Sequence, residues 1–164
     1  MSHVFIGIGS NLGDRRANCR AAVRMLEERG IRVVKTSALI ETEPWGVKEQ
    51  PPFINMALEA ETELDPQMLL GALKDIERAL GRQETLRWGP RTVDLDILFY
   101  DDLVMNGETL RIPHPLLHER DFVLIPLAGI APDKVHPILK KTIAELRREL
   151  EHDAYTDDQE QGKN

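Results

Sequence analysis

Two aspartates, Asp94 and Asp96, stand two positions apart in an apolar run that follows a group of arginines. In an extended strand alternate residues face the same side, and a rise of about 3.3 Å per residue separates these carboxylates by about 6.6 Å. Like charges at that distance repel unless a cation lies between them. Carboxylate oxygens suit Mg²⁺, which completes its coordination with water and substrate phosphate. The pair therefore predicts a magnesium site, and a polar strand face that meets solvent is the alternative.

The segment just before the aspartates is basic. Residues 78–91 hold four arginines and one glutamate, a local charge of +3 in a chain whose net charge is −7. Guanidinium groups bind phosphate through paired hydrogen bonds, and Mg²⁺ with arginines around phosphate is the machinery of phosphoryl transfer. A solvated helix end and loop is the alternative interpretation.

Neither of the common glycine-rich phosphate motifs is present. The chain has no G-x-x-x-x-G-K-[ST]. The stretch "GIGSNLGD" (7–14) fails the dinucleotide pattern because Leu12 occupies its third glycine position. Its glycines are predicted to form a tight turn between a strand and a helix instead.

The composition is that of a soluble globular domain. The chain has 164 residues, of which 41% are apolar and 30% charged. One cysteine, Cys19, excludes an internal disulfide and fits a reducing compartment. The N-terminus lacks the layout of a signal peptide, and no apolar run is long enough to span a bilayer. We therefore expect a cytoplasmic protein, and the acidic balance argues against nucleic acid or a membrane as partner.

The order of predicted elements indicates the fold class. Strands are expected at 3–9, 31–40, 53–61 and 92–100, with one helix after an Asp14 cap and one after Asp65-Pro66. Strand, helix, strand, strand, helix, strand is the split βαβ order. It predicts a ferredoxin-like α+β sandwich with helices on one face of an antiparallel sheet.

Further elements are expected after this unit. A hairpin at 103–112 would turn at Asn106-Gly107 in a two-residue type I′ turn, and a loop would follow over 113–122. A short helical piece is expected within 124–132, and "TIAE" (142–145) has the form of a capping box that opens a last helix. We expect a single domain over 1–152 and an acidic, disordered tail over 153–164.

Alternation assigns faces to two of the predicted strands. In 92–99 the core face would hold Val93, Leu95, Ile97 and Phe99, and the other face Thr92, Asp94 and Asp96. In 53–61 one face would hold Phe53, Asn55 and Ala57, and the opposite face Ile54, Met56, Leu58 and Ala60. An amide on a half-buried strand needs hydrogen-bond partners, so Asn55 is a candidate binding residue.

Four stretches in order carry a resemblance to a known family. They are "GIGSNLGD", "ETEPWG" (41–46) with "QPPFINMA" (50–57), "RWGPRTVDLDIL" (87–98) and "IPHPLLHERDFVLIPLAGIAP" (112–132). Together they closely resemble the 6-hydroxymethyl-7,8-dihydropterin pyrophosphokinases of folate synthesis, over roughly 1–137. The resemblance implies a ferredoxin-like fold and transfer of the pyrophosphoryl group of MgATP to the pterin hydroxymethyl group, with release of AMP.

The resemblance also implies roles for individual residues. Asp94 and Asp96 would hold two Mg²⁺, and Arg82 and Arg91 would neutralise charge that develops on the phosphates. The pterin would contact Thr42, Glu43, Trp45, Phe53, Asn55 and Phe122, with the two phenylalanine rings stacking on it and Asn55 bonding its edge. ATP would contact Arg87, Trp88, Ile97, Arg111, His114 and Arg120.

A loop over about 82–91 would close over both substrates, as in the family. Here it is less basic than in many relatives, because Gln83, Glu84 and Thr85 stand where those carry basic residues. Pro115 stands in place of the aromatic residue that some relatives have after the histidine. The less basic loop is expected to weaken ATP binding or to slow loop closure.

Two other functions fit parts of the pattern. A different Mg²⁺-dependent nucleotide or sugar-nucleotide transferase would use the two aspartates but would not need Asn55 or the two phenylalanines. A non-enzymatic ferredoxin-like module that binds a small metabolite would tolerate the loss of Asp94. For the pyrophosphokinase we expect a monomer that binds only small molecules.

Overall fold

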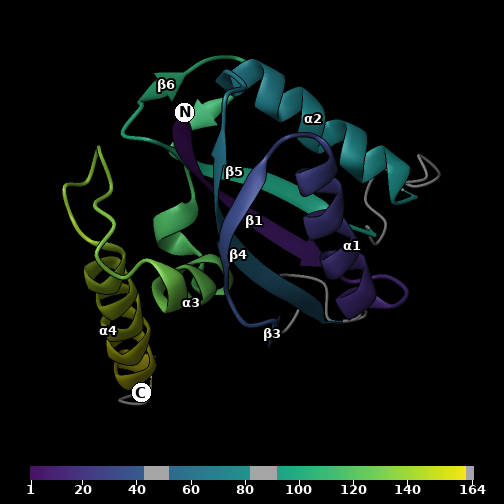
Figure 1. Cartoon of the computed structure of the whole chain (residues 1–164). Coiled ribbons are helices and arrows are strands. Elements are labelled where there is room, and N and C mark those ends of the chain that lie inside the picture. The colour runs from purple at the N-terminus through teal and green to yellow at the C-terminus, as the bar shows by residue number, and fades with distance from the viewer. Residues whose placement is uncertain (43–51, 82–91, 162–164) are drawn as a thin grey trace.

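An antiparallel sheet with two helices packed on it forms the centre of the structure (Figure 1). The computed structural model describes residues 1–42, 52–81 and 92–161, with side chains for all of these except Thr42 and 154–161. The elements are β1 (Ser2–Ser10), α1 (Arg15–Glu28), β2 (Arg32–Thr36), β3 (Ile40–Thr42), β4 (Phe53–Thr62), α2 (Pro66–Ala79) and β5 (Asp94–Tyr100). The strand order is β2-β4-β1-β5 with antiparallel neighbours, and β3 also pairs with β4. This is the ferredoxin-like α+β arrangement that the sequence predicts.

The predicted second strand, 31–40, is interrupted at Ser37. The Ser37 hydroxyl accepts a hydrogen bond from the Ala57 backbone N–H at 2.9 Å, where a continuous strand would offer a carbonyl. A side-chain acceptor competes with the sheet ladder in this way. The strand therefore divides into β2 and β3, and both pieces stay beside β4.

Both sheet-packing helices begin at the predicted caps. The Asp14 carboxylate accepts from the Ala17 N–H at 3.1 Å, and the Asp65 carboxylate accepts from the Met68 N–H at 2.8 Å. These bonds satisfy amides that have no partner in the first helical turn. After α2 the chain turns at Gly81, whose φ of +90° is a conformation that favours glycine.

Two apolar clusters cover the two faces of the sheet. The first joins α1 and α2 to β1, β4 and β5 through residues such as Leu26, Leu73 and Ile6. The second packs α3 (Asp121–Ile130) and α4 (Ile143–Gln161) against the opposite face, with Phe5 and Phe99 at its centre. Helices added after the ferredoxin-like unit thus cover part of the face that was expected to be open.

A β-bulge corrects the predicted face of Phe99. Phe5 pairs with Phe99 but Ile6 pairs with Ile97, so Leu98 is an extra residue in β5. A bulge reverses the alternation beyond it. Leu95 and Ile97 therefore face α1 and α2 as predicted, whereas Phe99 belongs to the second cluster, beneath α3 and α4.

The segment after β5 differs in detail from its prediction. The hairpin of β6 (Met105–Asn106) and β7 (Arg111–Ile112) is present, but the loop between its strands is Gly107–Leu110 rather than a two-residue turn. A 3₁₀ helix, η1 (Leu117–Glu119), and the start of α3 at Asp121 lie within the predicted loop 113–122.

The last helix opens with the predicted capping box. Thr142 Oγ1 accepts from the Glu145 N–H at 3.1 Å, and the Glu145 carboxylate accepts from the Thr142 N–H at 3.3 Å. Helical backbone continues to Gln161, within the segment predicted to be disordered. Among the described helices, none combines the length and the apolar character needed to cross a bilayer.

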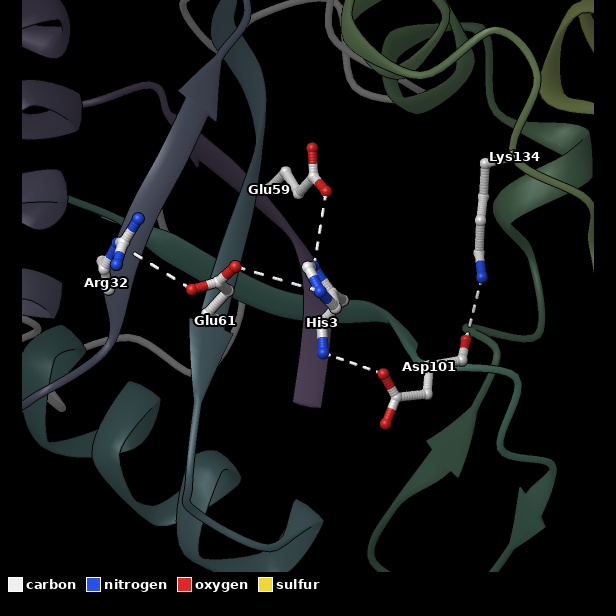
Figure 2. A network of polar contacts seen from close by, with 6 residues as sticks. All are labelled: His3, Arg32, Glu59, Glu61, Asp101 and Lys134. Carbon is white, nitrogen blue, oxygen red and sulfur yellow. Dashed lines mark hydrogen bonds and ion pairs between the residues drawn. The ribbon is translucent and has the colours of Figure 1, made fainter. Parts of the chain in front are cut away.

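Polar contacts connect the start of β1 to neighbouring segments at the end of the sheet that lies far from Asp94 and Asp96 (Figure 2). The His3 imidazole lies 3.7 Å from Glu59 and 3.9 Å from Glu61, and Glu61 lies 3.9 Å from Arg32. The His3 backbone N–H donates to Asp101, whose carbonyl accepts from Lys134 at 3.0 Å. His3, Arg32 and Asp101 are solvent-exposed and their partners are half-buried, and such surface pairs contribute little each. They join β1, β2, β4 and the turn after β5 at one end of the sheet.

The Asp65 cap yields a test of how α2 is held. Replacing Asp65 by Ala removes the acceptor for the Met68 N–H and should lower the free energy of unfolding by about 1 kcal/mol. Asp65→Asn keeps an acceptor oxygen at the same place and should lose much less. Urea unfolding followed by circular dichroism measures both variants, and equal losses would show that the cap bond does not stabilise the helix.

Candidate active site

Two rows of residues cross the sheet and form the floor of a cavity. In one row Gly9 of β1 pairs with Asn55 of β4 on one side and Asp94 of β5 on the other. In the next row Gly7 pairs with Ala57 and Asp96 in the same way. Because the middle strand carries glycine in both rows, no side chain rises between the amide on β4 and the carboxylates on β5.

The cavity above this floor has a volume of about 330 Å³. The first turn of α3, including Val123, lines another side of the cavity. Six residues that the sequence predicts for the site line it together: Phe53, Asn55, Asp94, Asp96, Arg120 and Phe122. Residues from β4, β5 and the start of α3, far apart in the sequence, therefore meet in one place.

The two predicted stacking rings, those of Phe53 and Phe122, are positioned by different elements of the fold. Phe122 lies in the first turn of α3, and the Arg120 guanidinium carbon is 5.5 Å from the centre of its ring, a cation–π distance. Phe53 begins β4 directly after Pro52, whose carbonyl accepts a hydrogen bond from the Arg15 guanidinium at 2.6 Å. The same Arg15 nitrogen lies 3.5 Å from the Glu41 carboxylate on β3. Arg15 of α1 thus fixes the point at which the chain enters β4.

A second cavity, of about 340 Å³, lies on the other side of Asp96. Leu70 and Lys74 of α2 line it on one side, and the Glu108–Arg111 part of the hairpin lines it on the other. Four predicted residues meet here: Asp96, Ile97, Arg111 and His114. Asp96 lines both cavities, so a ligand in one and a ligand in the other would meet at this carboxylate.

His114 lines the second cavity, and hydrogen bonds fix its position there. Its backbone N–H donates to the Leu98 carbonyl at 3.1 Å, and its Nδ1 accepts from the Leu116 N–H at 3.3 Å. Burial lowers the pKa of His114 below 6.5, while the Asp96 charge raises this pKa and the Arg120 charge lowers it. The imidazole is therefore neutral at pH 7, with Nδ1 as acceptor and Nε2 as donor.

The donor set at the aspartates fits magnesium. The described residues contain no group of three or more His, Cys, Asp or Glu side chains that could hold a metal. Two carboxylates that line a cavity large enough for phosphate are what Mg²⁺ needs from a protein, because water and phosphate fill the rest of its coordination. Zinc would require more nitrogen or sulfur ligands than the described residues offer here.

Comparison with known proteins decides the family. The family model described as 7,8-dihydro-6-hydroxymethylpterin-pyrophosphokinase (HPPK) matches residues 5–132. The chain belongs to this family. It is an ATP-dependent pyrophosphokinase that transfers pyrophosphate to hydroxymethyldihydropterin in folate synthesis. The family assignment excludes the sugar-nucleotide transferase and the non-enzymatic module.

Individual relatives agree with the HPPK assignment. The chain is 42% identical over 149 residues to the pyrophosphokinase of Aquifex aeolicus, covering 91% of this chain and 92% of that one. It is 46% identical over 127 residues to the Bacillus subtilis pyrophosphokinase, covering 77% of this chain and 76% of that one. A mitochondrial folate synthesis bifunctional protein of Arabidopsis thaliana is 47% identical over 127 residues, but these span 77% of this chain and 23% of that protein.

A solved structure supports the HPPK fold. Wild-type HPPK-DHPS of Plasmodium falciparum matches with a TM-score of 0.73 at 16% sequence identity. The match covers 90% of this chain and 44% of that longer chain. At this identity the likeness concerns the fold alone.

Several residues that the HPPK resemblance implies lie outside the described part of the chain: Glu43, Trp45, Arg82, Arg87, Trp88 and Arg91. The closing loop over about 82–91 lies there too. Thr42 ends β3 and pairs with Phe53, which brings its backbone to the edge of the first cavity. The roles of all these residues stay predictions.

Sequence reasoning missed four residues around the HPPK cavities. Gly7 and Gly9 lie inside β1 rather than in the turn, which Gly13 makes with a φ of +68°. Lys74 lines the second cavity and lies 3.3 Å from the Glu77 carboxylate. Glu77 is 2% exposed and accepts from the Leu95 N–H at 3.3 Å, between the two aspartates. A carboxylate beside the apolar stripe of α2 was the signal that could have revealed Glu77.

The geometry at His114 can be tested by nuclear magnetic resonance. The His114 ring should titrate below pH 6.5, and Asp96→Asn should lower that midpoint further because it removes the charge that raises the pKa. His136 is the internal control, because burial and the nearby His118 lower its pKa and Asp96 is not among the causes of that shift. A His114 midpoint that stays unchanged in Asp96→Asn would show that the two groups do not interact.

The same pKa shift has a consequence for stability. The unfolded chain binds the His114 proton more readily than the folded chain does. Above about pH 6.5 His114 is neutral in both the folded and the unfolded chain, and it does not reduce the free energy of unfolding. As the pH falls below about 6.5 the unfolded chain takes up the proton first, so the free energy of unfolding decreases.

Proposed function

We propose that Asp94 and Asp96 hold Mg²⁺, two ions in the loaded enzyme, at the point where the two substrates meet. The observation that carries this proposal is that Asp96 lines both cavities. A nucleotide in the second cavity and a pterin in the first then place the phosphates beside the carboxylate pair. When bound, Mg²⁺ neutralises charge on the phosphates and makes the β-phosphorus easier to attack.

The first cavity is assigned to the pterin. A flat, aromatic ring needs two apolar faces and a polar edge to read it. Phe53 and Phe122 supply the faces in this proposal, and Asn55 of β4 supplies an amide that both donates and accepts hydrogen bonds. Thr42, Glu43 and Trp45 complete the pterin site in the same assignment, carried over from the family.

The second cavity is assigned to ATP. Ile97 offers an apolar surface for the base, while Lys74 and Arg111 bring positive charge to the same cavity. Neutral His114 presents its Nε2–H as a hydrogen-bond donor to a phosphate oxygen. Arg120, with Arg82, Arg87 and Arg91 from the family pattern, adds positive charge around the triphosphate, and Trp88 is an uncharged ATP contact in the same pattern.

The reaction needs little covalent chemistry from the protein. The hydroxymethyl oxygen of the pterin forms a bond to the β-phosphorus, and the bond from that phosphorus to the oxygen bridging to the α-phosphate breaks. AMP leaves with the bridging oxygen, and the hydroxyl proton passes to solvent. The protein therefore acts by positioning and by electrostatic stabilisation, in which Arg82 and Arg91 have the catalytic roles.

The setting of the enzyme is also proposed. We expect a cytoplasmic monomer whose domain spans 1–152, with 153–164 as an acidic tail. Two relatives whose names describe them as bifunctional folate synthesis proteins carry the matched region as about a quarter of their length.

The metal assignment predicts the behaviour of three aspartate variants. Asp94→Asn and Asp96→Asn should each reduce AMP formation by about 100-fold or more at saturating substrates, because each removes one carboxylate ligand. Asp102→Asn is the matched control, since Asp102 is exposed and pairs with Lys134 away from both cavities. AMP is measured against Mg²⁺ concentration, with and without 6-hydroxymethyl-7,8-dihydropterin. Turnover close to wild type in Asp96→Asn would refute the magnesium site.

The pterin assignment predicts a selective effect at Phe122. Phe122→Ala should raise KM for the pterin by about tenfold or more, through loss of a stacking face, and leave KM for ATP nearly unchanged. Phe122→Tyr keeps the ring and should stay near wild type. Steady-state kinetics with each substrate varied in turn measure the difference. Equal losses for both substrates would show instead that Phe122 is part of the apolar core.

A further inference from the structure

Gly9 has a steric reason to be glycine that concerns one neighbour. It lies inside β1, between Asn55 and Asp94 in the register of the sheet. A Cβ built on Gly9 would lie 2.8 Å from Oδ1 of Asn55, closer than real Cβ atoms approach other heavy atoms. The next contact, with the Phe53 ring at 3.6 Å, is an ordinary one. The missing side chain therefore makes room for the Asn55 amide.

Backbone conformation does not explain this glycine. Positive φ angles occur at Gly13, Gly30 and Gly81 among the described glycines, whereas Gly9 has the extended backbone of a strand that any residue adopts. Gly7 is a useful comparison two residues earlier on the same floor. A Cβ there would meet the Leu98 side chain at 3.4 Å, which is ordinary van der Waals contact. The close approach at Gly9 is thus specific to Asn55.

The Asn55 side chain is buried, so any movement of its amide changes the positions of its hydrogen-bonding atoms. The residue is 8% exposed, and its side chain lies at the rim of the same floor as Asp94. The contacted atom is the far end of that side chain, so an alanine at position 9 can be accommodated by rotation of the amide. Such a rotation leaves the sheet intact but changes where Oδ1 and Nδ2 point.

We infer that Gly9 is a specificity-determining positioning residue, which sets the Asn55 amide in the place from which it reads the edge of the pterin ring. The inference rests on the proposed role of Asn55 at the pterin. The ligand class that depends on Gly9 is a flat heterocycle with adjacent donor and acceptor atoms on one edge, as in the amide part of a pterin. Recognition of ATP does not depend on it.

The test compares single and double variants in the AMP assay. Gly9→Ala should raise KM for 6-hydroxymethyl-7,8-dihydropterin by about tenfold, the effect of one misplaced hydrogen-bonding group, with KM for ATP unchanged. Asn55→Ala should raise the same KM. The double variant Gly9→Ala/Asn55→Ala should be no worse than Asn55→Ala alone, because the clash partner is gone. Gly71→Ala is the control, since Gly71 lies on the exposed face of α2 with nothing within 4 Å of its added Cβ.

Each outcome has one meaning. Additive losses in the double variant would overturn the inference, because Gly9 would then act on the ring directly or on the floor as a whole. A Gly9→Ala enzyme with wild-type KM, beside an impaired Asn55→Ala enzyme, would also overturn it. An unimpaired Asn55→Ala enzyme would instead remove the proposed role of Asn55 itself.

Folding is checked by circular dichroism on every variant. If Gly9→Ala fails to fold while the double variant folds, the contact with Asn55 is the cause and the steric part of the inference stands. If neither folds, Gly9 is a structural requirement of β1 and the inference is wrong.

Discussion

The carboxylates of Asp94 and Asp96 lie on one face of β5 and repel each other, and the residues packed around β5 hold them there despite that repulsion. The opposite face of the strand, at Leu95 and Ile97, is buried in the apolar cluster beneath α2, so the strand cannot move its two carboxylates away from the cavity face without giving up that burial. Glu77 of α2 holds the Leu95 N–H between the two aspartates. Folding therefore keeps the two charges together, and a cation bound at the proposed metal site would offset the repulsion.

In the proposed assignment, the same constraint places the substrates relative to each other. Asp96 borders both cavities, so the charged pair would lie where the acceptor hydroxyl and the phosphates meet. Arg120 reinforces this, since it lines the first cavity over the Phe122 ring and lies close enough to His114 to lower the pKa of that residue. Positive charge and the stacking face are thus parts of one structural unit at the start of α3.

Much of this architecture follows from local patterns in the sequence. The caps at Asp14 and Asp65, the alternation in β4 and the order of elements predicted the ferredoxin-like sheet, and Phe53 and Asn55 lie on the predicted face. Phe99 was assigned to the wrong face because a bulge at Leu98 depends on how β5 meets β1, which single-strand alternation does not record. The role of Gly9 does not follow from the sequence for a related reason, because it depends on a contact with Asn55 of the paired strand β4. The apolar stripe at helical spacing predicts α2 and its buried face but does not indicate which polar residues beside it, such as Glu77 and Lys74, reach the site.

The most direct test of the account is a crystal structure of the enzyme with Mn²⁺ in place of Mg²⁺, a non-hydrolysable ATP analogue and 6-hydroxymethyl-7,8-dihydropterin. Anomalous scattering from manganese locates the metal independently of the ligands. The account predicts manganese at the carboxylates of Asp94 and Asp96, the pterin ring between Phe53 and Phe122, and the analogue in the cavity lined by Ile97 and His114. Manganese bound away from the two aspartates, or a pterin bound outside the cavity above Gly9, would contradict it.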